Sequence, residues 1–176
     1  MPEEKLELAK EIFWRYNGLF FHMDREGEYE KYKAFNISKN QERAWREERR
    51  DELFEKLSIE KNKRVLSSLF RGIADIVKVL EDKVGLQKML LFLNENNEQF
   101  DTFVVLLLAE TVVHTTIAFN NSEQLKKSVL KSCLRILENT LKKTFSISMD
   151  YEGAFYEPMT EEKVRNRIEV LIRQCR

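Results

Sequence analysis

Apolar side chains recur every three or four positions along most of this chain, the spacing that places them on one face of an α-helix. This helical spacing of apolar residues is most complete over residues 58–83. Applied to the whole chain, the spacing predicts seven helices, over residues 3–24, 38–57, 58–83, 86–93, 100–119, 123–144 and 160–175. We therefore expect an all-α fold: a bundle of six or seven helices that forms a single helical domain, residues 1–176.

Local signals predict where several of these helices begin and end. Side chains that commonly cap a helix N-terminus precede four of them: Ser38, Asp101, Ser122 and Thr160. Gly85 is expected to end the helix over 58–83. The apolar spacing continues through Asn17 and Gly18, so the first helix is expected to run through both. Residues 24–37 fit either a short helix or an irregular segment.

The segment 100–119 is apolar on all sides when plotted as a helix. That pattern is typical of a helix surrounded by other helices, or of a membrane span. A span needs about 20 mostly apolar residues with few charges. Glu110 lies in the middle of the segment, where a carboxylate would be costly inside a bilayer. We expect a buried central helix at 100–119 and no membrane association.

Between the last two helices, residues 145–151 alternate between apolar and polar side chains, the period of a half-buried strand. Glu152 and Gly153 could turn the chain back. The pattern predicts a small β-hairpin near 145–157, which would need to pack on the helices because an isolated hairpin is marginally stable.

Composition and charge narrow the class of protein further. The chain has 43% hydrophobic and 34% charged residues with five Gly and two Pro, which favours long helices in a folded domain. Thirty basic and thirty acidic residues cancel, so no overall field attracts nucleic acid or an anionic membrane. The first residues are charged and lack the apolar stretch of a signal peptide. Cys133 and Cys175 are too few for a disulfide framework or a zinc site. A cytoplasmic location is the simplest expectation.

Glu110 and His114 lie one turn apart in the most apolar part of the chain. One interpretation is a structural pair inside the core, in which Glu110 accepts a hydrogen bond from His114 or from a neighbouring helix. The alternative is a cavity in which both side chains bind a small molecule or a metal, as in a sensor or enzyme. Carboxylate metal sites in bundles need further Glu residues from facing helices, and no second such pair appears, so the structural pair is favoured and no metal is expected. A cavity lined by both side chains would favour the ligand-binding alternative.

A basic stripe follows one side of the helix over 123–144. Its members are Lys127, Lys131, Arg135 and Lys142. The stripe could contact phosphates or an acidic protein, but the solvated face of an amphipathic helix accounts for it equally simply. No nucleic-acid recognition motif accompanies it, so binding to nucleic acid is the weaker alternative.

No motif for covalent chemistry or phosphate binding is present in the sequence, and no cofactor is expected. Surplus aromatic residues, Trp14 and Phe21 among them, are candidates for an exposed interaction patch together with the basic stripe. The expected function is therefore that of a non-enzymatic protein-interaction or regulatory module. Its partner would be another protein or a second copy of the chain, and a small-molecule ligand near Glu110 and His114 is kept as the alternative.

Overall fold

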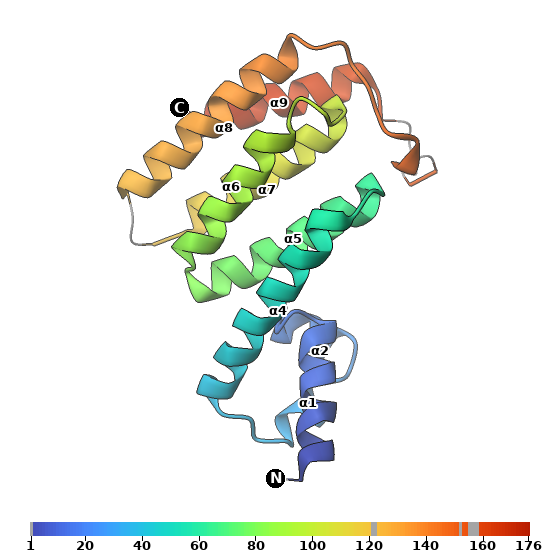
Figure 1. Ribbon diagram of the computed structural model, residues 1–176, viewed down its shortest axis with the longest axis vertical. Coiled ribbons are helices and arrows are strands. Elements are labelled where there is room, and N and C mark those ends of the chain that lie inside the picture. Colours follow the sequence, from blue (N-terminus) through green and yellow to red (C-terminus); the bar gives the residue numbers. More distant parts are fainter. Residues whose placement is uncertain (1, 121–122, 152, 155–158) are drawn as a thin grey trace.

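A computed structural model describes all residues of the chain except 1, 121–122, 152 and 155–158. Within these residues the structure is all helical and contains no strand (Figure 1). The helices are α1 (Glu3–Arg15), α2 (Phe20–Arg25), α3 (Tyr29–Lys33), α4 (Lys39–Ile59), α5 (Lys63–Leu80), α6 (Lys83–Asn96), α7 (Thr102–Ala118), α8 (Glu123–Leu141) and α9 (Glu161–Cys175), with a short 3-10 helix, η1 (Met149–Tyr151). The all-α prediction is confirmed.

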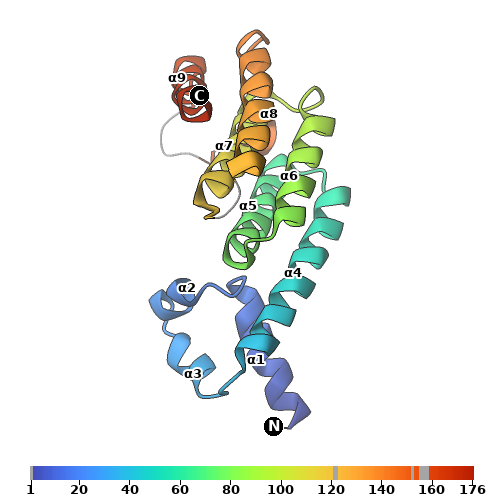
Figure 2. The ribbon, with the colours of Figure 1, turned by 90° about the vertical axis from the view of Figure 1, so that its left-hand side faces the viewer.

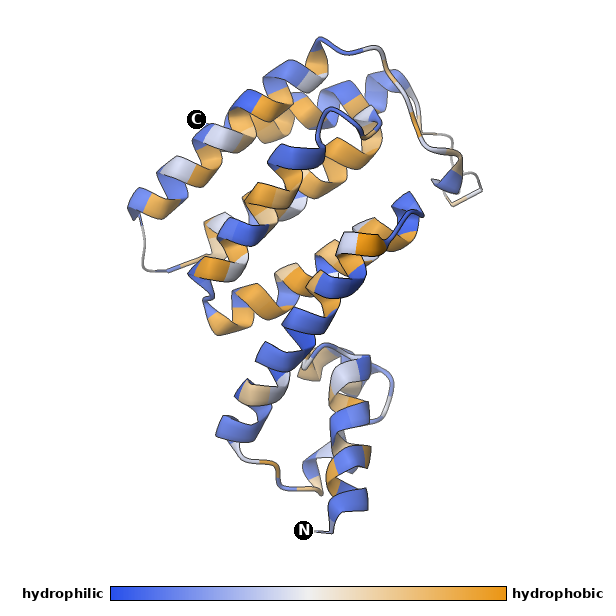
Figure 3. Ribbon diagram, in the orientation of Figure 1, coloured by the Kyte–Doolittle hydropathy of each residue, from blue (hydrophilic) through white to orange (hydrophobic). Residues whose placement is uncertain are grey.

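The main core is built around α7, as the apolar character of its sequence predicts. α7 packs against α5, α6, α8 and α9, and most of its side chains are buried (Figures 1 and 2). The hydropathy colouring shows the same organisation, since apolar residues dominate α5 and α7 while the first half of α4 is mostly polar (Figure 3). Among the described residues, no helix is both long and apolar enough to cross a membrane.

A second, smaller core lies at the N-terminal end, where α1, α2 and α3 gather beside the first half of α4 (Figure 2). We call it the N-terminal cluster; its buried apolar residues are Ala9, Ile12, Phe13, Met23, Tyr32 and Trp45. The 21-residue α4 joins the two cores, because Trp45 belongs to the N-terminal cluster whereas Leu53 and Leu57 belong to the main core. The expectation of one domain over 1–176 stays a prediction.

The first predicted helix is interrupted, and the expectation of a continuous helix over 3–24 is wrong. Asn17 and Gly18 have positive φ angles of 50° and 70°, a left-handed conformation that ends an α-helix. The Gly18 amide donates to the Phe13 carbonyl at 2.8 Å. A Cβ atom at Gly18 would lie 2.7 Å from the Phe13 ring, so the position also needs glycine for space. The apolar spacing continues across the break because α1 and α2 both pack into the N-terminal cluster.

The boundary between α5 and α6 also differs from the prediction. Helix α5 begins after Asn62, whose side chain accepts from the Val65 amide, so it starts later than residue 58. It ends at Leu80, and Glu81 takes the left-handed conformation with a φ of 50°. Gly85 therefore lies inside α6 instead of ending α5. A Cβ there would lie 2.7 Å from Val77, so close packing between two helices explains this glycine.

Three of the four predicted N-caps are confirmed. Ser38 accepts from the Gln41 amide, Asp101 from the Phe103 and Val104 amides, and Thr160 from the Lys163 amide. Ser122 lies outside the described residues.

The segment expected to form a hairpin crosses the start of α7 without forming a strand in its described part, residues 145–151. The Phe103 amide donates to the Ser146 carbonyl at 3.3 Å. The Tyr151 side chain, in η1, donates to the Lys63 carbonyl at 3.0 Å. Of the alternating apolar residues, Phe145, Ile147 and Tyr151 pack against the helices, whereas Met149 is 82% exposed. Ala154, at the start of the predicted return, is not in a strand, and the rest of the return, 155–157, lies outside the described residues.

Candidate functional site: a groove over the central helix

One face of α7 is left open by the helices that surround it. α5 and α9 both pack against α7, yet they do not contact each other in the part of the chain that the structure describes. Apart from Ala118 at its C-terminal end, the positions of α7 that keep solvent exposure are Leu107, Glu110, Thr111, His114 and Ile117. Their spacing of three and four residues places them on one face of the helix. α7 is therefore the floor of a groove, and α5 and α9 are its walls.

Three adjoining pockets make up this groove, which we call the α5–α9 groove. The pocket of about 370 Å³ includes Arg71 and Arg167. The pocket of about 400 Å³ shares Arg71 with it and is also lined by Glu110 and His114. The pocket of about 210 Å³ shares Arg167 with the first and Glu110 and His114 with the second. Each pocket shares lining residues with the other two, so the three pockets adjoin one another along α7.

The expectation that Glu110 and His114 pair with each other inside the core is wrong, whereas the other expected arrangement, a hydrogen bond from a neighbouring helix to Glu110, is present. His114 is exposed, and the Glu110 side chain is 29% exposed. Glu110 pairs with Arg167 of α9, whose Nη2 lies 2.6 Å from its Oε2, and no hydrogen bond joins it to His114. Both residues instead line the groove, the arrangement set out above as favouring a binding site. No group of three or more carboxylate, imidazole or thiol side chains suited to a metal ion occurs among the described residues.

The rim of the groove carries more basic than acidic side chains. Arg64, Arg71 and Lys78 lie on the α5 wall at intervals of seven residues, and Arg167 lies on the α9 wall. Lys78 pairs with Asp75 at 2.8 Å, and Arg167 pairs with Glu110. Arg64 and Arg71 are exposed and have neither an ion pair nor a hydrogen bond within the described part of the chain. These two guanidinium groups are therefore available to an anionic group.

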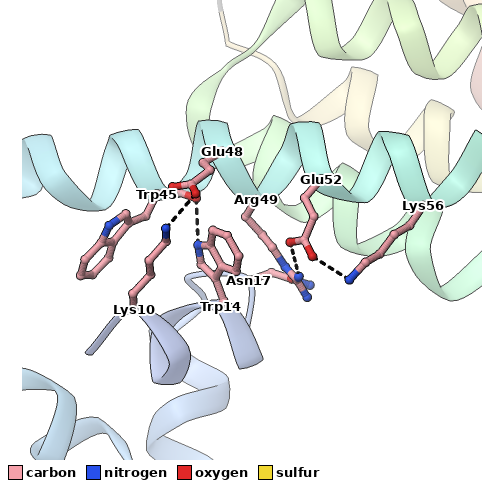
Figure 4. Close-up of polar contacts among 8 residues, drawn as sticks. All are labelled: Lys10, Trp14, Asn17, Trp45, Glu48, Arg49, Glu52 and Lys56. Atoms are coloured by element: carbon pink, nitrogen blue, oxygen red, sulfur yellow. Dashed lines mark hydrogen bonds and ion pairs between the residues drawn. The ribbon is translucent and has the colours of Figure 1, made fainter. Parts of the chain in front are cut away.

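Trp14, a predicted interaction residue, lies in the joint between α1 and α4 (Figure 4). Its indole Nε1 donates to the Trp45 carbonyl at 3.2 Å. The Lys10 ammonium lies 4.5 Å from its ring centroid, and the Arg49 guanidinium lies 5.4 Å from it. A partly buried ring between two cations contributes to internal packing, so the structure gives Trp14 a contact within the chain.

The other predicted surface residues are on the surface, far from one another in the sequence. Phe21 is 75% exposed, and its ring lies edge-on to the neighbouring His22 ring. The basic stripe is exposed along the outer side of α8: Lys127, Lys131, Arg135 and Lys142. None of these five residues lines the α5–α9 groove.

Arg46 is a buried cation that the sequence pattern did not single out. Its guanidinium carbon lies 4.8 Å from the Phe13 ring centroid, and its Nη2 donates to the Gly18 carbonyl at 3.0 Å. Glu42 lies 3.8 Å away and accepts a hydrogen bond from the Tyr32 hydroxyl. Burial lowers the pKa of Arg46, and the charge of Glu42 opposes that shift. These contacts hold the N-terminal cluster together and leave the α5–α9 groove as the candidate site.

The chain matches no protein-family model, no curated protein and no solved structure.

Proposed function

We propose that this protein is an interaction module whose α5–α9 groove binds an amphipathic helix of a partner protein. The open face of α7 is the observation that carries this proposal. A helix that is apolar on all sides is expected to be surrounded, and four helices already cover the rest of α7. A fifth helix between α5 and α9 would complete its burial, as in other complexes in which a helix lies in a groove.

The dimensions of the groove fit a helical ligand. The 17 residues of α7 span about 25 Å at about 1.5 Å per residue. A partner helix of similar length could lie along it, with its apolar side over Leu107 and Ile117 and beside Val170 of α9. Small-molecule sites usually enclose most of their ligand, whereas this depression is open along its length, which favours the helix.

Charge favours a different protein over a second copy of this chain. A symmetric dimer uses the same surface patch on both subunits. Closing two such grooves on each other would bring Arg64 and Arg71 of one copy towards those of the other, and like charges in an interface are unfavourable. A partner helix with acidic residues on its edges would instead complement the α5 wall.

The proposal can be tested by cross-linking from the groove floor in cells of the source organism. A photoreactive amino acid at Thr111 should capture a partner protein, whereas the same group at Lys131, on the outer side of α8, should not capture that protein. The captured protein's helical segments would then be made as labelled peptides and titrated against the purified chain by fluorescence anisotropy.

Two matched variants place the bound peptide. Val170 and Val79 are 52% and 50% exposed, but only Val170 lines the groove. Val170→Asp should weaken binding about tenfold or more, since truncating or charging a central contact typically costs ~1–3 kcal/mol, and Val79→Asp should leave it unchanged. Equal effects of the two variants, or concentration-dependent dimers in sedimentation that Val170→Asp abolishes, would contradict the proposal.

A further inference from the structure

The pocket at the start of the groove is the most basic part of the site. Arg64 and Arg71 of α5 and Arg167 of α9 all line it, together with the Ser68 hydroxyl, and none of the described residues in its lining is acidic. Phe103 and Leu107 of α7 and Ala154 contribute apolar surface to its lining. The pocket thus combines several cationic donors with a surface suited to a side chain that ends in an anion.

The nearby polar groups are already engaged and do not neutralise this pocket. The Tyr151 hydroxyl lies 2.6 Å from Ser67 Oγ and donates to the Lys63 carbonyl. Burial raises the pKa of Tyr151, and its hydrogen bond with Ser67 and the charge of Arg71 oppose that shift. The two carboxylates that also act on Tyr151, Asp101 and Asp150, accept from backbone amides at the starts of α7 and α5.

The net positive charge of the pocket favours an anion with two negative charges over an anion with one. Three guanidinium groups carry three positive charges, and the ion pair of Arg167 with Glu110 offsets one of them. Two positive charges remain, on the unpaired Arg64 and Arg71. A phosphate monoester carries about −1.5 to −2 at pH 7, whereas a carboxylate carries about −1. Guanidinium groups also bind phosphate oxygens in pairs of parallel hydrogen bonds.

We propose that this pocket is a phosphate-binding subsite, which takes a phosphorylated side chain on the partner helix. The inference rests on the proposed function for the source of the phosphate, since Arg clusters recognise phosphorylated segments of proteins. Binding then depends on modification of the partner, and the groove acts as a reader of that modification.

The subsite can be tested with small probes, without knowledge of the partner. Phenyl phosphate and benzoate share an aromatic ring and differ in the anion, so each is titrated into the isotope-labelled chain and followed by NMR of backbone amides and Arg side chains. Phenyl phosphate should shift the signals of Arg64 and Arg71. It should bind about tenfold or more tightly than benzoate, the factor expected for one additional charge-assisted hydrogen bond. Its affinity should fall as the pH is lowered through about 6, where the phosphate loses its second charge.

Variants locate the site. Arg64→Gln and Arg71→Gln should each weaken phenyl phosphate binding about tenfold, and the double variant should abolish it. Arg71→Lys should recover part of the binding, since it restores the charge without the paired donors. Arg173→Gln, an exposed α9 residue outside the pocket lining, serves as the control and should bind as the wild type does. Benzoate binding as tightly as phenyl phosphate would overturn the phosphate assignment, and unchanged binding by the double variant would overturn the location.

The outcome is separable from that of the proposed function. If phenyl phosphate does not bind but a partner peptide still requires Val170, the subsite is refuted and the interaction groove stands. If phenyl phosphate binds at Arg64 and Arg71 while Thr111 captures no partner, the groove proposal fails and the anion site stands alone.

Discussion

The N-terminal cluster and the main core achieve burial by different means. The N-terminal cluster is assembled from helices as short as the five residues of α3, and aromatic rings dominate it, with Phe13, Tyr32 and Trp45 at its centre. The main core is mostly aliphatic and surrounds the 17-residue α7.

Helix length explains the difference. A helix of one or two turns presents few side chains to a core, so each must be large, and an aromatic side chain buries about 150–250 Å². Rings also have faces on which a cation can stack, which is how the N-terminal cluster accommodates Arg46. A long apolar helix needs no such compensation, and buried threonines such as Thr116 and Thr140 donate to carbonyls of their own helices.

The largest expected effect is on stability, and it should differ between the covered and the open face of α7. Leu108 is fully buried, whereas its neighbour Leu107 lines the groove. Leu108→Asp should cost more than about 4 kcal/mol and unfold the main core, because it removes a buried side chain and introduces an unpaired charge. Leu107→Asp should cost at least ~2 kcal/mol less, since its carboxylate can reach water. Urea unfolding followed by circular dichroism measures both. Equal losses would show that this face of α7 is covered in solution.

The second prediction tests whether the N-terminal cluster can unfold while the main core stays folded. Phe13→Ala should cost the N-terminal cluster about 3–5 kcal/mol, the usual range for a buried Phe. Hydrogen exchange should then show α1, α2 and α3 losing protection while α7 keeps it, since Phe13 belongs only to the N-terminal cluster. Phe21→Ala, at an exposed position of the same region, is the control and should change stability by less than ~0.5 kcal/mol. Loss of protection throughout α7 would indicate that the chain unfolds as one unit.

A smaller loss of stability is expected when the buried cation, Arg46, is replaced. Arg46→Met keeps most of the side-chain volume but leaves the Gly18 carbonyl without its donor and Glu42 without its neighbouring cation, so the free energy of unfolding should fall by about 1–3 kcal/mol. Arg43→Met is the matched control on the same helix, because Arg43 forms an exposed ion pair with Glu47 of the kind worth ~0–1 kcal/mol. An unchanged stability of Arg46→Met would mean that apolar packing, and neither the hydrogen bond nor the cation over Phe13 and Phe20, is the main contribution of this side chain.

The smallest expected effects are at the groove itself. Glu110→Gln removes a half-exposed ion pair with Arg167 and should cost less than about 1 kcal/mol. His114→Ala, at an exposed position, should change stability by less than ~0.5 kcal/mol. Thermal unfolding of both variants beside the wild type checks this. Losses of ~2 kcal/mol or more would restore the interpretation of a buried structural pair.

Sequence alone determined the elements whose residues repeat a strong local pattern. The apolar spacing of α4, α5, α8 and α9 and the continuous apolar character of α7 predicted these helices, and three capping side chains fixed where α4, α7 and α9 begin. These features depend on interactions within a few residues, so the chain sequence contains them directly. The interruption at Asn17 and Gly18 was missed because helices on both sides of it face the same cluster.

Only the tertiary structure decided which side of α7 is exposed. Glu110 and His114 do lie on the face that no other helix covers, but the rest of α7 is apolar enough to be buried on every side, so the pattern alone did not separate an exposed face from a pair inside the core. The open face follows from how α5 and α9 pack on α7 without meeting. For the same reason Glu110 is paired with Arg167, 57 residues further along the chain, and not with His114 one turn away. The partner of a side chain at a helix surface depends on which other helix lies beside it, and that arrangement is set by the packing of the whole core.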